Sequence, residues 1–134
     1  MYTPLISTFY LILPLLLFLT KQNPPWLEIF LATLLSINIF FSLVFWSNPV
    51  KHSRIHVYDS FFAKLSYVIF VPYILYKPME EYMKIIFLIL LAFAAMMMYY
   101  SNCYSKQTWC CQPHEVCHSM FHMFTGIGCM FAFL

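Results

Sequence analysis

Long apolar runs separated by short polar clusters dominate this chain of 134 residues. Five of the runs approach the roughly 20 residues that a helix needs to cross a hydrocarbon core about 30 Å thick. They cover residues 2–20, 26–46, 53–76, 83–100 and 116–134, and in the third the apolar part begins at residue 61. The runs are continuous rather than alternating, and only helices and closed barrels satisfy their backbone in lipid. We therefore predict an all-α fold, a polytopic transmembrane bundle of about five helices that forms a single domain over residues 1–134.

Composition supports a membrane protein and argues against most other classes. Hydrophobic residues make up 63% of the chain and charged residues 9%, whereas soluble domains are roughly 45–50% apolar and about 25% charged. The formal net charge of +2 is too small and too scattered for nucleic-acid binding. We expect an integral, multi-pass protein whose partner is membrane lipid and not nucleic acid. The oligomeric state stays open, and both an endomembrane and a viral envelope suit the composition.

The basic residues bear on processing and on orientation. The first run has no basic segment before it and no small-residue cleavage site before Lys21, so we expect it to be retained rather than removed as a signal peptide. The two sets of loops carry three basic residues each: Lys21, Lys77 and Lys84 on one side, Lys51, Arg54 and Lys106 on the other. Because the positive-inside rule depends on an excess, the orientation remains undecided.

The side chains best suited to chemistry form two groups, at the starts of the third and the fifth predicted helices. Two helices that are separated by one other helix cross a membrane in the same direction. Both groups are therefore expected at the same membrane face and at similar depth, where they would share one site. The members are His52, His56 and Asp59 in the first group, and His114, His118 and His122 in the second.

The spacing of the histidines is typical of metal ligands on a helix. Three pairs stand four residues apart, at positions 52/56, 114/118 and 118/122, and residues at this spacing share one helix face with Cβ atoms roughly 5–6 Å apart. Zinc binds histidine nitrogens at about 2.0–2.1 Å, and a catalytic zinc has three protein ligands and a water. A pair from the fifth helix and one histidine from the third would complete such a triad. Asp59 is placed to ligate, to orient a ligand or to hold the water.

A plainer interpretation applies to some of these residues. Histidines near helix ends also lie in the headgroup region without binding anything, which suits His52 and His114 best. His122 lies about one turn inside the fifth run, where ionisable side chains are costly and usually functional. Asp59 has alternative partners in the basic residues at positions 54 and 64.

The segment His118-Ser-Met-Phe-His122-Met-Phe-Thr125-Gly126-Ile-Gly128 resembles the last-helix signature of the alkaline ceramidases. That family belongs to a superfamily of membrane hydrolases that includes the progestin/adiponectin receptors and the myomaker-like proteins. Its members carry a Ser and, four residues later, a His near the end of an early helix. An Asp follows at the start of the next helix, and the paired histidines lie in the last. The resemblance implies a zinc site with His118 and His122 as the paired ligands.

The other residues of the implied site lie around the start of the third helix. Asp59 matches the aspartate. The third ligand is His56, which is closer to the aspartate than is usual, or alternatively His52, which is better spaced but lies in a predicted loop. The candidate for the serine is Ser53, three residues before His56, while Asn48 stands four residues before His52. Seven helices are usual in the superfamily and this chain has room for five, so it resembles a distant, shortened relative.

The resemblance implies zinc-assisted hydrolysis of an amide or ester bond in a lipid. Zinc lowers the pKa of bound water to about 7 and polarises the carbonyl, while Asp59 acts as base or orients the water and Ser53 helps to place it. We therefore expect a metal-dependent membrane hydrolase with zinc as its cofactor, and we do not carry over ceramide as the substrate. The alternative is a non-enzymatic structural or assembly membrane protein, for example of a viral envelope, in which the histidine cluster is incidental or purely structural. A haem carrier ranks last, because histidines four apart on one helix do not ligate opposite faces of one haem.

The cysteines leave a further choice open. In an oxidising lumen they would form disulfides, and in the cytosol they would remain thiols or carry palmitate. Four of the five lie close to the start of the fifth helix: Cys103, Cys110, Cys111 and Cys117.

Overall fold

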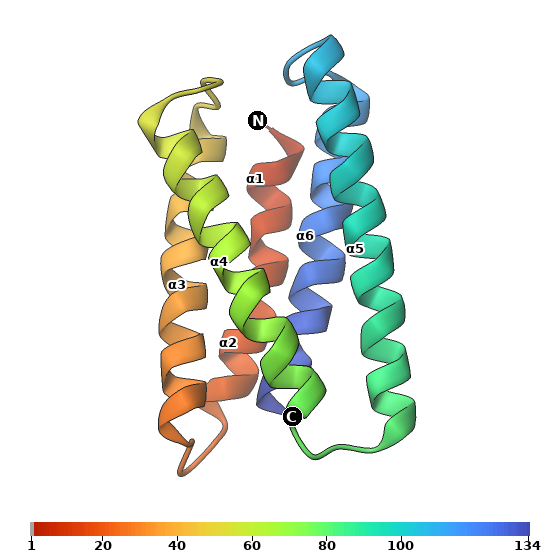
Figure 1. The fold of residues 1–134 in the computed structure, drawn as a ribbon. Helices are drawn as coiled ribbons and strands as arrows, with labels where there is room; N and C mark the ends of the chain where they lie inside the picture. The colour runs from red at the N-terminus through yellow and green to blue at the C-terminus, as the bar shows by residue number, and fades with distance from the viewer. Residues whose placement is uncertain (1) are drawn as a thin grey trace.

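The computed structural model describes residues 2–134, and within this range the chain forms helices joined by short turns (Figure 1). The N-terminal rod consists of α1 (Thr3–Ser7), the 3₁₀ segment η1 (Thr8–Leu11) and α2 (Ile12–Leu19). Four long helices follow: α3 (Trp26–Ser47), α4 (Arg54–Tyr76), α5 (Glu81–Gln107) and α6 (Gln112–Phe133). The predicted all-α class and the division into five helical rods are confirmed.

The boundaries near the last turn differ from those expected. Helix α5 continues to Gln107, and α6 begins at Gln112, because Pro113 occupies the first turn, where a backbone N–H would have no helical partner. Cys103 and Cys117 consequently lie within helices, and the turn between α5 and α6 contains only the cysteine pair at 110 and 111. All five cysteines are free thiols.

A proline shapes the middle of the N-terminal rod. Pro14 has no N–H to bond the carbonyl of Tyr10, and its ring crowds that carbonyl, so a regular α-helical turn cannot form at this point. The chain instead passes through the 3₁₀ turn of η1 just before Pro14. The Tyr10 carbonyl oxygen accepts a backbone N–H at the end of η1, and it also faces a neighbouring helix, which is α6 at Gly126.

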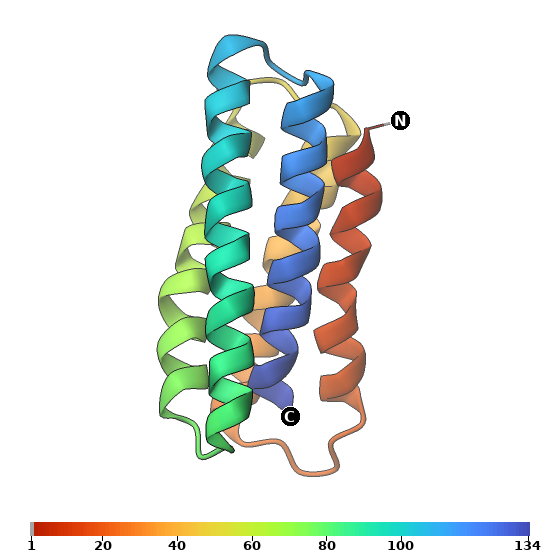
Figure 2. The same ribbon diagram turned by 90° about the vertical axis from the view of Figure 1, so that its right-hand side faces the viewer.

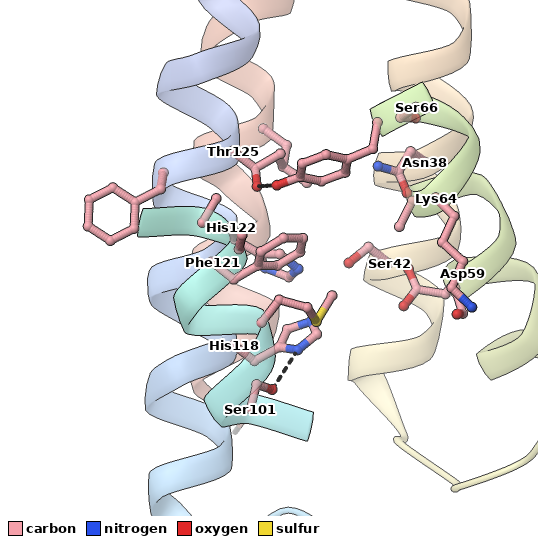
Figure 3. Close-up of a pocket in the computed structure, with 18 of the residues that line it drawn as sticks. Asn38, Ser42, Asp59, Lys64, Ser66, Ser101, His118, Phe121, His122 and Thr125 are labelled. Atoms are coloured by element: carbon pink, nitrogen blue, oxygen red, sulfur yellow. Dashed lines mark hydrogen bonds between the residues drawn. The ribbon is translucent and has the colours of Figure 1, made fainter. Parts of the chain in front are cut away.

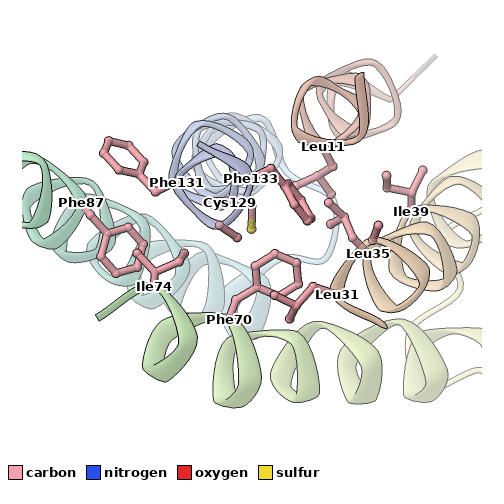
Figure 4. Close-up of a cluster of buried hydrophobic side chains, with 12 residues drawn as sticks. Leu11, Leu31, Leu35, Ile39, Phe70, Ile74, Phe87, Cys129, Phe131 and Phe133 are labelled. Atoms are coloured by element: carbon pink, nitrogen blue, oxygen red, sulfur yellow. The ribbon is translucent and has the colours of Figure 1, made fainter. Parts of the chain in front are cut away.

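Helix α6 is the central element of the bundle. It packs along α5 on one side and along the whole N-terminal rod on the other, whereas α3 packs mainly on α4. Figures 1 and 2 show α6 between these partners, with α4 crossing the front of the bundle. Although α4 and α5 are consecutive in the chain, they scarcely touch each other. The core side chains Ile74 and Phe87 fill the inner part of the seam between α4 and α5 (Figure 4).

An apolar core fills the half of the bundle that contains the C-terminus (Figure 4). The Phe133 ring packs edge-on against Phe18 at 5.4 Å and against Phe70 at 6.1 Å between ring centroids. These contacts join the N-terminal rod, α4 and α6. The remaining core side chains are Leu11, Leu31, Ala32, Leu35, Ile39, Ile74, Phe87, Cys129, Phe131 and Ala132.

The same end of the bundle is closed by an ionic cluster. The Glu28 side chain is only 3% exposed and lies 2.5 Å from Lys21 Nζ and 3.3 Å from Lys77 Nζ. The Tyr73 hydroxyl donates a hydrogen bond to the Glu28 carboxylate, and Lys77 also donates to the carbonyl of Ala132 near the end of α6. A buried carboxylate needs such partners. The cluster ties α3, α4 and α6 together at this end.

Three helices are long and apolar enough to cross a membrane by length and composition: α3, α5 and α6. The N-terminal rod is apolar but shorter, and α4 carries Arg54, Asp59 and Lys64 in its first half. These features identify a membrane protein.

Replacing Gly126 tests the contact between α6 and the N-terminal rod. A Cβ atom there would lie 2.5 Å from the Tyr10 carbonyl oxygen and 2.8 Å from its carbon, so one backbone must move, at a cost of about 1–3 kcal/mol. At Gly128 the added atom comes no nearer to the Phe87 ring than 3.7 Å, an ordinary contact. We expect Gly126→Ala to lower the thermal unfolding temperature of the protein in detergent clearly more than Gly128→Ala. Both changes alter helix propensity equally, so identical melting curves would contradict the contact.

Candidate functional site

A cavity of about 1060 Å³ extends from the end of the bundle opposite the ionic cluster to the edge of the apolar core. Side chains of α3, α4, α5 and α6 line it, and these include all five histidines and Asp59. The structure thus brings together the two groups that the sequence places at one face. The predicted serine, Ser53, does not line the cavity: it is the N-cap of α4, where its Oγ accepts a hydrogen bond from the backbone N–H of His56 at 3.2 Å.

One wall of the cavity is formed by the paired histidines of α6 (Figure 3). His118 and His122 stand one turn apart with their ring centroids 4.7 Å from each other. His118 Nδ1 lies 3.2 Å from the hydroxyl of Ser101 on α5, and His122 Nδ1 lies 2.9 Å from the hydroxyl of Ser7 on α1. Each ring is therefore oriented by a hydroxyl group from a different helix.

The opposite wall holds the carboxyl group of Asp59 on α4 and the hydroxyl group of Ser42 on α3. Ser42 is buried, and its hydroxyl lies within hydrogen-bonding reach of the half-buried Asp59 carboxyl group. In the part of the chain that the structure describes, Asp59 makes no ion pair with Arg54 or Lys64. Figure 3 shows Ser42 and Asp59 across the cavity from His118 and His122.

The other histidines are held by a recurring backbone motif. His52, with φ of 63°, donates its backbone N–H to Nδ1 of His56 at 3.0 Å. Cys110, with φ of 54°, donates in the same way to Nδ1 of His114 at 3.2 Å. A ring nitrogen that accepts carries no proton, so neutral His56 and His114 are protonated on Nε2. Both rings thereby fix the turns that lead into α4 and α6.

Sequence reasoning missed Ser42 and Trp46. Ser42 stands four residues before Trp46 near the end of α3, which is the spacing that the resemblance gives to its serine and its third histidine. The expected pattern is a serine followed by a histidine, and Ser42 was missed because a tryptophan follows it four residues later. The Trp46 ring is 1% exposed and lies 4.7 Å from the His118 ring between centroids.

The donor set does not fit the three-histidine zinc site that the resemblance implies. Among residues 2–134, no three His, Cys, Asp or Glu side chains lie close enough to share one metal ion. The indole of Trp46, which lies beside the His118 ring, is a hydrogen-bond donor only and cannot ligate. His56, the predicted third ligand, uses Nδ1 to accept a backbone hydrogen bond and stacks on Phe45 at 4.7 Å. The zinc site thus stays a prediction, and no step described below uses it.

The thiols of the turn before α6 offer no substitute ligand. Cys110 lies in that turn, and burial, together with the nearby Glu115 carboxylate, raises the pKa of its thiol to about 11. The thiolate is the form that binds metals and attacks electrophiles. At neutral pH Cys110 is protonated and plays neither part.

Two buried polar atoms on the cavity walls have no hydrogen-bond partner among the described residues: Trp46 Nε1 and Ser66 Oγ. Leaving such a group unsatisfied costs about 1–3 kcal/mol, and folded proteins normally provide a partner. Ser66 is 6% exposed and lies on α4, two turns deeper than Asp59. Both residues line the cavity, but these two atoms are enclosed by the surrounding protein and are not exposed to the cavity.

Comparisons of the chain with protein-family models, with curated proteins and with solved structures found no match. The resemblance to the alkaline ceramidase superfamily consequently rests on the residues of this chain alone.

Metal content tests the effect of Trp46. Because no third ligand is grouped with His118 and His122 among the described residues, we expect the purified wild-type protein to hold clearly less than one zinc ion per chain. Trp46→His supplies a third imidazole beside His118 and should raise the zinc content toward one. Adding His122→Ala to Trp46→His should remove that zinc. Plasma-emission analysis after dialysis measures all three. One zinc per wild-type chain, lost in His122→Ala, would contradict this assignment and restore the predicted site.

Proposed function

We propose that the protein crosses the membrane five times and binds an amphiphilic lipid in its internal cavity, where it hydrolyses an amide or ester bond of that lipid. The observation that carries the proposal is the composition of the cavity walls. Ionisable side chains, which are rare inside membranes, converge there with hydroxyl groups from α3, α4 and α6.

The outer surface supports five spans rather than three. Large apolar side chains are exposed on every rod, and soluble proteins rarely expose apolar surface on this scale. Tryptophan and tyrosine favour the two interfaces of a membrane. At the end with the ionic cluster the exposed aromatic residues are Trp26, Tyr76 and Tyr82, and at the other end they include Tyr58, Tyr99 and Tyr100.

The cavity changes from polar to apolar with depth. Its outer part contains the histidines, Ser42 and Asp59, and its inner part reaches Phe70, Ile74 and Phe87 of the apolar core. An amphiphile matches this gradient when its polar linkage lies beside the histidines and its hydrocarbon chain extends toward the core. Hydrocarbon burial contributes about 0.8 kcal/mol per CH₂ group.

A lipid can reach the cavity sideways. Residues of both α4 and α5 line it, including Val68 and Tyr99, which are 70% and 65% exposed on the outer surface. Because α4 and α5 scarcely touch, the seam between them connects the cavity with the surrounding hydrocarbon. A substrate could enter along this seam without leaving the bilayer.

The walls provide the groups that hydrolysis requires. Asp59 takes a proton from a water molecule, and the resulting hydroxide adds to the carbonyl carbon of the substrate. When the carbon–oxygen or carbon–nitrogen bond breaks, Asp59 returns the proton to the leaving alcohol or amine. The products are a carboxylic acid and that alcohol or amine.

A second function is favoured by a specific observation. The ligand set for zinc is not assembled among the described residues, and without a metal the cavity can bind a lipid and leave it intact. The protein would then be a non-enzymatic membrane component whose histidines hold a lipid and stabilise the bundle.

Occupancy of the cavity is measured through Trp46. In a chain with Trp26→Phe and Trp109→Phe, Trp46 is the single tryptophan, and its ring is enclosed except toward the cavity. A fatty ester brominated along its chain, added to protein in detergent, should quench this fluorescence saturably. Ser66→Leu places apolar bulk in the cavity and should weaken the quenching. If the fluorescence is quenched no more than that of free tryptophan in the same micelles, the binding proposal is wrong.

Turnover distinguishes the two candidate functions. We expect the wild-type protein to release fatty acid from fluorescent acyl esters or amides, and Asp59→Asn to lower the rate about 10²- to 10⁴-fold, the contribution of a positioned base. Quenching of Trp46 should persist in that variant. Ser119→Ala, whose hydroxyl only bonds the Glu115 carbonyl, is the control and should keep its rate. Lipid binding without release of fatty acid in the wild type would favour the non-enzymatic function.

A further inference from the structure

The N-terminal rod reaches the candidate site through Ser7. This residue is 5% exposed, and its hydroxyl lies 2.9 Å from Nδ1 of His122. Thr8, fully buried, lies 3.4 Å from the same nitrogen and 3.3 Å from the hydroxyl of Ser42. The ring of His122 is thus surrounded on its Nδ1 side by two hydroxyl groups of the first helical rod.

Each of these hydroxyl groups already donates its hydrogen to a backbone carbonyl oxygen. Ser7 Oγ donates to the carbonyl oxygen of Pro4 at 3.0 Å, and Thr8 Oγ1 donates to the same oxygen at 2.8 Å. A hydroxyl group has one hydrogen to donate. The bond between Ser7 and His122 therefore needs its hydrogen on Nδ1, with the Ser7 oxygen as acceptor.

The opposite tautomer would make fewer hydrogen bonds. With the proton on Nε2, Ser7 would have to turn its hydrogen from Pro4 to Nδ1, and one of three bonds would be lost. In a buried site a lost hydrogen bond is not replaced by water. The surroundings of Nδ1 thus favour a protonated nitrogen there.

The other ring nitrogen is left free. His122 Nε2 makes no hydrogen bond within the described residues and is not among their enclosed polar atoms that lack a partner, so it borders the cavity that His122 lines. With the proton on Nδ1, Nε2 presents a lone pair to the cavity. His56 and His114 have the reverse arrangement, because their Nδ1 atoms accept backbone N–H groups.

We propose that Ser7 is a positioning residue that holds His122 as the Nδ1–H tautomer, so that its Nε2 lone pair faces the cavity as an acceptor or base. Pro4 completes the arrangement by accepting the Ser7 hydrogen. The first helical rod is thereby part of the site. This inference concerns the protein without ligand and does not depend on the proposed lipid or on catalysis.

The register of the rod against α6 makes this contact possible. Both elements run in the same direction, and pairs along them lie side by side: Thr3 with Glu115, Ser7 with His122, and the Tyr10 carbonyl with Gly126. Because glycine has no Cβ, the backbones approach closely at Gly126, one turn beyond His122.

Nitrogen NMR of the ring tests the proposal directly. In protein labelled with ¹⁵N-histidine and held in bicelles above pH 7, protonated and bare ring nitrogens resonate far apart. The signals of His122 are assigned by their loss in His122→Gln, and His56 and His114 serve as internal references. We expect His122 to be protonated on Nδ1 and bare on Nε2, with the reverse pattern for the two references. A His122 protonated on Nε2 in the wild type overturns the proposal.

Variants of Ser7 show whether this residue sets the tautomer. Ser7→Ala removes the acceptor for Nδ1–H and should shift His122 toward the Nε2–H form, whereas Ser7→Thr retains the hydroxyl and should keep the wild-type pattern. Ser119→Ala, on α6 but off the cavity, should also keep it. If Ser7→Ala leaves the His122 signals unchanged, Ser7 does not position the ring. The wild-type spectrum remains decisive should Ser7→Ala not fold, and loss of lipid binding or turnover would not alter it.

Discussion

The close backbone contact between Tyr10 and Gly126 is the constraint on which the arrangement of the bundle depends. The Tyr10 carbonyl lies in the 3₁₀ segment just before Pro14, and the glycine allows α6 to approach it at a distance where a Cβ atom would lie 2.5 Å from the oxygen. This contact sets the register of the first rod against α6. The same register carries the Ser7 hydroxyl to His122 and the Thr3 hydroxyl to Glu115. A local defect in one helix thus decides which side chains meet at the site.

Buried polar groups find their partners in different ways in the two halves of the bundle. At one end, Glu28 is neutralised by two lysines, and apolar side chains fill the space beside it. At the other end, hydroxyl groups and imidazoles bond one another around a cavity, and two polar atoms remain without partners. Lipid offers no hydrogen bonds, so polar groups within a span must be satisfied inside the protein. The two polar atoms without a partner both belong to residues that line the cavity. For this reason the functional proposal concerns the cavity and not the ionic end.

Much of the fold follows from the sequence, because run length and proline placement determine where membrane helices begin and end. The grouping of the histidines was also predictable, since helices separated by one crossing run in the same direction. The partners of those histidines were not. Ser7 and Ser101 lie on other helices than His118 and His122, and only the rotation and register of the packed helices bring them together. The role of Ser53 could not be predicted from the sequence either. Its spacing from His56 suits a helix N-cap and a catalytic serine equally well, and the structure shows the N-cap.

The number of helices bears on what the cavity can do. A hydrolase that adds water to a carbonyl needs walls that exclude bulk solvent and hold the reacting groups in place. Here α6 is held firmly, by α5 on one side and the N-terminal rod on the other, whereas α4 touches α6 only lightly and α5 hardly at all. The histidine wall is therefore held by α5 and the N-terminal rod, whereas the Asp59 wall is held mainly by the packing of α4 on α3. Binding of a lipid along the α4–α5 seam would fill the space that additional helices occupy in a larger bundle. The ligand itself would then fix the distance between Asp59 and His122, so that binding is required to assemble the reactive arrangement.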